Sequence, residues 1–276
     1  MPMFRPLPAS EEAPALHVRT RTPTVFRAAA ATWPAVKDWS FPYLASLDPG
    51  LPVQLVAGNR ETARTRFTSS TLGSYIGSLT RDAPSDDAPA YLKEFDLLKK
   101  FPQLRADLRS RELFPSGTIR SSATWIGPSR ARTGLHCDLL DNLAVQIMGT
   151  KRFYLAGPGA VKRAGKESGK YDAWARLSLV GAEELAAGQE HGGFFVVDLE
   201  PGDVLYVPAY WWHEVVNLTP GVLLSGFFGP RTRVLSRWAW VQARECLHRA
   251  GLLGRGDCTC HDHSDSGAGR RSPGSA

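Results

Sequence analysis

Disulfide-forming and membrane-spanning features are scarce in this sequence of 276 residues. It has four cysteines, none in a Cys-x-x-Cys pair and three near the C-terminus, which argues against a disulfide framework. The longest apolar run covers nine residues, 204–212, and contains Pro208, so it is too short to cross a bilayer. The first residues carry Arg5, Glu11 and Glu12 where a signal peptide would be apolar. These absences predict a cytoplasmic protein with reduced thiols and no membrane contact.

The composition is that of a folded globular chain without internal repeats. Hydrophobic residues make up 43% of the sequence and charged residues 22%, a balance that argues against wholesale disorder. The formal net charge of +6 permits an acidic or nucleic-acid partner, but so moderate an excess is weak evidence for one. The length allows one large domain or two small ones.

The second half of the chain reads as a series of short strands. Apolar, β-branched and aromatic residues gather at 118–126, 143–148, 151–156, 194–199, 204–207, 211–217 and 221–228. Turn signals such as Gly149-Thr150 and Pro201-Gly202-Asp203 separate these stretches. Because no long helix intervenes, the pattern predicts an antiparallel barrel or jelly roll, mainly β with flanking helices.

The rest of the chain divides around this predicted core. Residues 1–117 mix helix and strand signals and predict a flanking N-terminal α/β region. The core spans 118–230 and carries a long insert at 161–193. Residues 231–254 predict a C-terminal helix, and the polar, Gly-rich residues 255–276 predict a disordered tail. The Trp-bearing helix is expected to pack on its own domain or on a second copy, with a homodimer slightly favoured.

His136 and Asp138 carry the clearest chemical signal. They are two residues apart, so on a strand their side chains share one face. His213 follows an apolar strand 77 residues after His136, and closure of the jelly roll can bring it to that face. Two imidazoles and one carboxylate with open coordination positions are the ligand set of non-haem Fe(II) oxygenases. A metal-free jelly roll with two core histidines is disfavoured because all three ligands are present.

Four short sequence stretches around and between these ligands complete a family pattern. They are Trp125-Ile126-Gly127-Pro128, Thr133-Gly134-Leu135-His136-Cys137-Asp138, Gly149-Thr150-Lys151-Arg152-Phe153-Tyr154 and Pro201-Gly202-Asp203-Val204-Leu205-Tyr206-Val207-Pro208. With them the chain resembles the JmjC-type, cupin-like Fe(II)/2-oxoglutarate oxygenases, near the asparaginyl hydroxylase that represses hypoxia-inducible factor. The resemblance covers roughly residues 23–229. It implies a double-stranded β-helix that holds Fe(II) through His136, Asp138 and His213 and uses 2-oxoglutarate and O₂.

The resemblance also implies cosubstrate contacts. Lys151 and Thr133 match the residues that bind the distal carboxylate of 2-oxoglutarate, and Asn142 matches one that lies near the cosubstrate. A buried cation is costly alone but tolerable beside a carboxylate and a hydroxyl, which agrees with this role for Lys151. Several relatives place an Asn on the last strand, where this chain has Ser225 and Phe227, and Ser225 is therefore the fourth residue expected to bind the cosubstrate. The tyrosine that contacts 2-oxoglutarate in many relatives has no secure match in this sequence.

The sequence therefore predicts an oxygenase that couples decarboxylation of 2-oxoglutarate to hydroxylation of a C–H bond. An amino-acid side chain in a protein or peptide is the favoured substrate. The alternatives are a modified tRNA base, a small natural product, or a non-catalytic cupin-like binding module. Loops at residues 33–39, 81–90 and 161–193 are expected around the mouth of the site. A basic cluster in the insert suits an acidic peptide or a phosphate backbone. Its members are Lys162, Arg163, Lys166 and Lys170.

The predicted tail contains a short run of metal-binding residue types. Cys258, Cys260, His261 and His263 lie within six residues of one another. A zinc finger places two to four residues between its cysteines, and here there is one. A flexible tail with adventitious affinity for a soft metal is the favoured interpretation.

Overall fold

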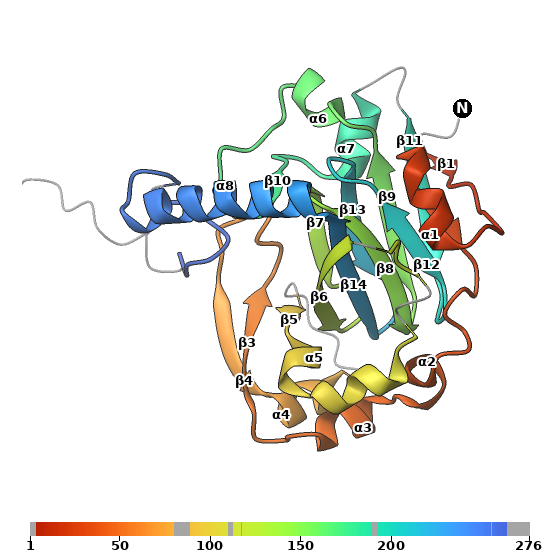
Figure 1. Cartoon of the computed structure of the whole chain (residues 1–276). Coiled ribbons are helices and arrows are strands. Elements are labelled where there is room, and N and C mark those ends of the chain that lie inside the picture. The colour runs from red at the N-terminus through yellow and green to blue at the C-terminus, as the bar shows by residue number, and fades with distance from the viewer. Residues whose placement is uncertain are drawn as a thin grey trace, which may run out of the picture.

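Two β-sheets that pack against each other form the centre of the protein (Figure 1). The structure is a computed structural model and describes residues 4–79, 89–109, 113–116, 118–188, 193–254 and 256–263. In spatial order, the smaller sheet contains β1 (Arg5–Pro6), β11 (Phe194–Leu199), β9 (Lys151–Ala156), β13 (Trp212–Asn217), β7 (Arg132–Asp138) and β10 (Ala175–Leu177). The larger contains β2 (Thr24–Phe26), β12 (Val204–Val207), β8 (Asp141–Met148), β14 (Gly221–Pro230), β6 (Thr118–Gly127), β5 (Ala90–Phe95), β3 (Pro52–Ala57) and β4 (Phe67–Thr71).

Core strands that follow one another in sequence mostly alternate between the two sheets. β6 lies in the larger sheet, β7 in the smaller, β8 in the larger and β9 in the smaller, and β12, β13 and β14 alternate in the same way. The ladders within the core are antiparallel. This is the connectivity of a jelly roll, so the predicted fold class is confirmed.

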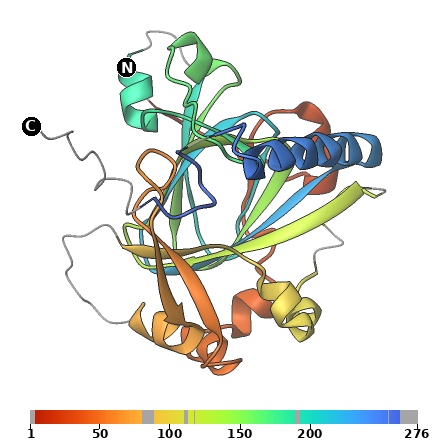
Figure 2. The same cartoon turned by 90° about the vertical axis from the view of Figure 1, so that its left-hand side faces the viewer.

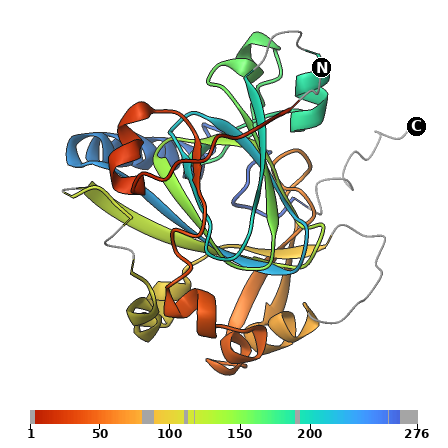
Figure 3. The same cartoon turned by 90° about the vertical axis from the view of Figure 1, so that its right-hand side faces the viewer.

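Helices, most of them short, cover the outside of the sheets. They are α1 (Pro14–His17), α2 (Pro34–Asp38), α3 (Phe41–Ser46), α4 (Leu72–Ser78), α5 (Leu97–Lys100), α6 (Ala160–Arg163), α7 (Ala182–Ala187), α8 (Arg231–Arg249) and the 3₁₀ turns η1 (Val18–Thr20) and η2 (Pro102–Asp107). Figure 2 shows the long helix α8 outside the strands and the β3–β4 hairpin projecting from them. Figure 3 shows the N-terminal segment along the outside of the strands, where β1 pairs with β11. No helix in the described ranges is long and apolar enough to cross a membrane.

Alternation along the strands separates an inner from an outer core. Along β8, Ala144 packs between the two sheets, whereas Val145 and Ile147 pack on the outer face under the helices. Trp33 and Trp39 belong to this outer cluster and are only 1% and 6% exposed. The expectation that residues 33–39 line the mouth of the site was therefore wrong, because both indoles are used for packing. Residues 81–88, the greater part of another predicted mouth loop, lie outside the described residues.

The outer face of the smaller sheet has its own apolar cover. Leu135 and Cys137 of β7 pack there with Leu185 of α7 and Val161 of α6. Burial raises the pKa of the Cys137 thiol to about 12, so this thiol is inert packing. Since alternate residues of a strand point to opposite faces, His136 and Asp138 point inward, between the sheets.

Candidate active site

The pairing of β7 with β13 brings the distant histidine to the predicted face. His213 lies opposite His136 in the register, and their ring centroids are 4.1 Å apart. Nε2 of His213 lies 3.6 Å from Oδ2 of Asp138, and Nε2 of His136 lies 4.0 Å from Oδ1. The structure thus brings the three predicted ligands together, with one ligand atom of each within 4.8 Å of the others.

Backbone carbonyls orient both imidazole rings. Nδ1 of His136 lies 2.7 Å from the carbonyl of Gly134, and Nδ1 of His213 lies 3.1 Å from the carbonyl of Trp211. Each Nδ1 must donate its proton to the carbonyl, which leaves Nε2 with a free lone pair. Such a second contact is what fixes the tautomer and angle of metal-ligating histidines.

The buried setting keeps both rings neutral. Burial lowers the pKa of His213 to about 4, and burial together with the adjacent His213 lowers the pKa of His136. Burial also raises the pKa of Asp138 to about 6. A cation among these groups would favour the ionised carboxylate and keep the imidazoles unprotonated, so the donor set fits a divalent metal.

A bulge in β7 explains the position of Thr133. His136 pairs with His213, but Thr133 pairs with Val215. Between these two pairs β7 advances by three residues and β13 by only two, so β7 contains one extra residue. The extra residue turns Thr133 to the inner face, although simple alternation would place it with Leu135 outside. A Cβ on Gly134 would lie 2.6 Å from Oδ1 of Asn59 and 2.9 Å from Cβ of Glu61, so a larger residue at this bulge would force these neighbours to shift.

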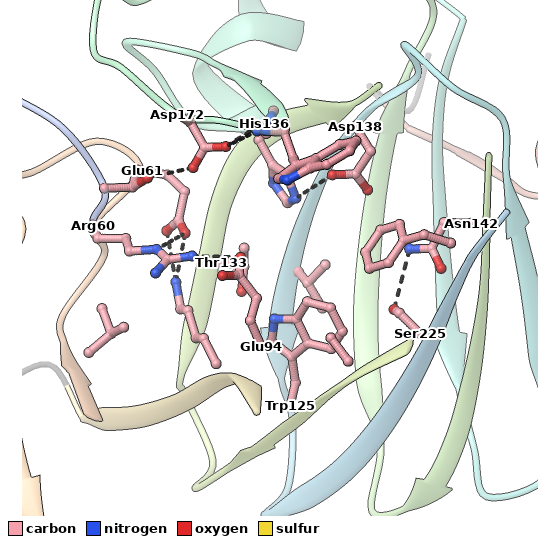
Figure 4. Close-up of a pocket in the computed structure, with 18 of the residues that line it drawn as sticks. Arg60, Glu61, Glu94, Trp125, Thr133, His136, Asp138, Asn142, Asp172 and Ser225 are labelled. Carbon is pink, nitrogen blue, oxygen red and sulfur yellow. Dashed lines mark hydrogen bonds and ion pairs between the residues drawn. The ribbon is translucent and has the colours of Figure 1, made fainter. Parts of the chain in front are cut away.

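The three candidate ligands open onto a pocket of about 640 Å³ between the sheets (Figure 4). The four predicted cosubstrate residues all line it. They are Thr133, Asn142, Lys151 and Ser225. The structure therefore places every predicted site residue around one cavity, and their chemical roles are taken up below.

Lys151 lies at the start of β9 and is fully buried. Its Nζ donates a 2.6 Å hydrogen bond to the hydroxyl of Tyr91 on β5. Within the described part of the chain no carboxylate pairs with it, and burial with the nearby Lys93 charge lowers its pKa to about 7. A buried ammonium without an anionic partner is a recognition element for an anion that enters the pocket.

Asn142 and Ser225 are diagonal neighbours on the paired strands β8 and β14. Nδ2 of Asn142 donates to Oγ of Ser225 at 3.3 Å, as Figure 4 shows. Oδ1 of Asn142 is buried and has no hydrogen-bond partner among the described residues. Phe227 lies opposite Asn142 in the register and also lines the pocket. The unsatisfied oxygen marks a position where a bound group can donate a hydrogen bond.

Sequence reasoning missed the contribution of the N-terminal region to this pocket. Tyr91, Glu61 and Lys93 all line it. Nζ of Lys93 donates to both oxygens of Glu61, at 2.9 and 2.8 Å, and Glu61 also accepts from the backbone N–H of Gly134. Burial opposes the charge of Glu61, but Lys93 and Arg60 lower its pKa to about 2. The sequence carries little signal for this contribution, because Glu61 lies in a polar stretch and a single lysine after Tyr91 and Leu92 does not reveal a partner.

The insert contributes to the pocket through different residues from those expected. Asp172 and Trp174 line it, whereas none of the four basic residues of the predicted cluster does. Lys166 instead lies 3.8 Å from Glu184, and Lys170 lies 3.1 Å from Asp257. Because none of the four basic residues lines the pocket, the expected basic mouth is not present there.

Comparison with known proteins places this jelly roll in a family. The sequence profile of the cupin-like domain matches residues 9–233. The chain belongs to the cupin-like domain family. Its similarity to JmjC proteins confirms the JmjC-type relationship that the sequence stretches indicated.

The relatives of this cupin-like chain have different named roles. It is 29% identical over 164 residues to tRNA wybutosine-synthesizing protein 5 of Homo sapiens, covering 59% of this chain and 49% of that protein. It is 26% identical over 220 residues to Jumonji C domain-containing protein 5 of Drosophila melanogaster, covering 74% and 53%. It is 26% identical over 223 residues to lysine-specific demethylase JMJ30 of Arabidopsis thaliana, covering 74% and 49%. The chain spans about half the length of these curated relatives.

Proposed function

We propose that this protein is an Fe(II)- and 2-oxoglutarate-dependent oxygenase that hydroxylates a C–H bond. One observation carries the proposal. Two neutral imidazoles and a carboxylate converge at a pocket that also contains a buried lysine with no carboxylate partner among the described residues. The three ligands suit Fe(II) and leave positions open, and the lysine suits the far carboxylate of a dicarboxylic acid.

His136, Asp138 and His213 would hold the metal. Their neutral nitrogens and single carboxylate match the donor set of non-haem Fe(II) oxygenases. When bound, Fe(II), 2-oxoglutarate and O₂ supply an oxidant for a C–H bond, with succinate and CO₂ as co-products. The carbonyls of Gly134 and Trp211 keep both rings in the ligating tautomer.

Lys151 and Thr133 would orient 2-oxoglutarate. The Lys151 ammonium supplies a charge-assisted hydrogen bond, and the β7 bulge presents the Thr133 hydroxyl to the same cavity. Tyr91 holds the lysine in place and is a third candidate donor. Asn142 and Ser225 would hydrogen-bond the cosubstrate or the substrate from the opposite sheet.

The favoured substrate is an amino-acid side chain in a protein or peptide. Trp125, Phe227 and Trp174 give the pocket apolar walls suited to an aliphatic chain. A side chain can reach into such a pocket while its backbone stays outside. The names of the JmjC relatives, which include a lysine-specific demethylase, support this substrate class.

A modified tRNA base is the second candidate. It is favoured by the similarity to tRNA wybutosine-synthesizing protein 5 of three vertebrates. The net charge of +6 agrees with it. A tRNA substrate predicts binding that weakens steeply as salt rises, because each phosphate contact releases a counterion.

Anaerobic titration with Fe(II) and 2-oxoglutarate, followed by aerobic turnover, tests the proposal. We expect the visible absorption of a 2-oxoglutarate–Fe(II) complex and then succinate formation. Mass spectrometry of candidate peptides and of tRNA should find one added oxygen on one of the two. Binding of metal without 2-oxoglutarate, and without succinate formation, would identify a non-catalytic binding module instead.

The homodimer and the cytoplasmic location stay proposals. Trp238 and Trp240 on α8 are 54% and 44% exposed, which suits a contact with a second copy. Light scattering of the native chain and of Trp238→Glu tests the dimer. Cell fractionation tests the location.

A further inference from the structure

A second group of metal-binding side chains lies outside the jelly roll. His248 from α8 meets Cys258, Cys260 and His261 from the segment that follows the helix. One ligand atom of each lies within 4.8 Å of all the others. This segment, residues 256–263, falls in the region that the sequence predicted to be a disordered tail.

Four of the six distances between the ligand atoms suit a tetrahedral site. Nδ1 of His261 lies 3.1 Å from Sγ of Cys258, 3.5 Å from Sγ of Cys260 and 3.3 Å from Nε2 of His248. Sγ of Cys260 lies 3.3 Å from Nε2 of His248. Tetrahedral zinc with ordinary bond lengths requires roughly 3.3–3.8 Å between such atoms. The four measured edges match this range to within a few tenths of an ångström.

His248 is oriented as a ligand. Its Nδ1 lies 2.7 Å from the carbonyl of Leu253, so the ring donates there and Nε2 is left to face the cysteines. The ring also stacks on Tyr171, with the centroids 4.0 Å apart and the planes 18° apart. A carbonyl and a stacked aromatic ring hold the imidazole at a fixed angle.

The cysteine-bearing segment is held by its backbone. Cys258 is buried, and its carbonyl accepts a hydrogen bond from the hydroxyl of Thr65 at 2.7 Å. The backbone of Cys258 also forms an isolated parallel β-bridge with Tyr171. The N–H of Thr259 donates to the carbonyl of Tyr171 at 3.0 Å. His263 supports the group, since its Nε2 accepts from the N–H of Cys258 at 3.2 Å. The segment that carries both thiols is therefore held by hydrogen bonds to Thr65 and to Tyr171.

We propose that His248, Cys258, Cys260 and His261 bind a structural Zn²⁺ ion. Two thiolates neutralise the ion, two imidazoles complete a tetrahedron, and four protein ligands leave no position for a substrate. The spacing between Cys258 and Cys260 is too short for a zinc finger, and it works here because α8 supplies a ligand that lies ten residues before Cys258. Binding releases the thiol protons to solvent and involves no change of oxidation state.

The ion fixes one wall of the pocket. Thr259 and Cys260 line the candidate active site, and the Thr259 hydroxyl donates to Asp172, which lines it too. Zinc would therefore hold α8, the insert and the loop containing Thr65 together beside the pocket. With free Zn²⁺ at 100 times its Kd, opening of the segment is suppressed about 100-fold.

Zinc content of the full-length protein tests the proposal. Because the first ligand set also attracts zinc, Asp138→Ala is the background for every sample. We expect one Zn²⁺ per chain in this background and none after Cys258→Ser with Cys260→Ser. Cys246→Ser is the matched control, since Cys246 is an exposed thiol on α8 outside the group, and it should keep the ion.

Two further measurements do not require that the variant with both Cys258→Ser and Cys260→Ser, the cluster variant, folds. Chelated Asp138→Ala protein titrated with Co²⁺ should show thiolate-to-cobalt charge transfer and tetrahedral d–d absorption. Hydrogen exchange at the Tyr171 and Thr259 amides should accelerate when zinc is removed. Absence of the cobalt bands, equal zinc in the cluster variant and its background, or a mass two hydrogens lower from a Cys258–Cys260 disulfide would each overturn the proposal.

Discussion

Nζ of Lys151 and the hydroxyl of Tyr91 form a 2.6 Å hydrogen bond between β9 and β5, which are far apart in the sequence. The hydroxyl gives the buried ammonium an acceptor but no negative charge. Folding therefore leaves the desolvation cost of Lys151 only partly offset. A dicarboxylate that enters the pocket can offset the remainder of this cost.

Removing the ammonium should weaken cosubstrate binding selectively. Lys151→Ala removes a buried charge-assisted bond worth roughly 2–5 kcal/mol, so the KM for 2-oxoglutarate should rise about 30-fold or more. Thr133→Val should act in the same direction more mildly. Fe(II) binding should be retained, since neither residue belongs to the metal-binding set. Succinate assays with Lys37→Ala, an exposed lysine, serve as the control. An unchanged KM in Lys151→Ala would remove this residue from the cosubstrate site.

Cosubstrate binding should take up a proton above neutral pH. Burial and the Lys93 charge lower the pKa of Lys151 to about 7, so the free protein loses this cation as pH rises past that value. The bound carboxylate requires the cation, and affinity should therefore fall by up to about tenfold per pH unit above pH 7. Calorimetry at pH 8 in buffers of different ionisation enthalpy measures the uptake. Lys151→Ala should abolish it, and uptake that persists in this variant would assign the proton to another group.

Each of the three metal-site residues should be needed for turnover. Asp138→Ala removes the only carboxylate of the set, and His213→Ala removes a buried nitrogen donor. Both variants should lose Fe(II) from the pocket and produce no succinate, because two remaining donors hold the ion weakly. Lys151→Ala provides the comparison, since it should keep the metal and lose cosubstrate affinity. Full activity with stoichiometric iron in His213→Ala would show that the metal is held elsewhere.

The Glu61–Lys93 pair should stabilise the fold, and acid should remove its contribution. Glu61→Gln leaves Lys93 buried without its counter-charge and should cost about 3–5 kcal/mol of unfolding free energy. Glu61→Gln with Lys93→Met should recover most of that loss. Urea unfolding at pH 6 measures both.

The lowered pKa of Glu61 determines how the free energy of unfolding changes with pH. Lys93 and Arg60 overcome the effect of burial and hold this pKa at about 2, against an ordinary value of 4.5. The stabilisation is complete above the ordinary value and is lost as pH falls toward 2, by roughly 3 kcal/mol in all. Glu61→Gln should lack this part of the acid dependence. An identical acid dependence in both proteins would contradict the assignment.

The sequence by itself determined most strands of the core, although β7 and β10 were not among the predicted stretches, and it determined that His136 and Asp138 share one face of a strand. Both follow from local periodicity, since alternate residues of a strand must point to opposite sides. The start of α3 is also a local feature, because the hydroxyl of Ser40 accepts from the N–H of Tyr43, three residues later. Such features depend on residues close together in the chain. The assignment of Lys151 and His213 to the same site came from the family resemblance.

Only the tertiary structure decided which distant residues meet. The β7 bulge puts Thr133 on the opposite face from the one that simple alternation gives, and the bulge is visible only in the pairing with β13. Tyr91 reaches Lys151 because β5 joins the larger sheet. Cys258 and Cys260 meet His248 because backbone hydrogen bonds to Tyr171 and Thr65 fold the segment back. Contacts of this kind depend on strand pairing and chain reversal across the whole fold, and local periodicity in the sequence carries no information about them.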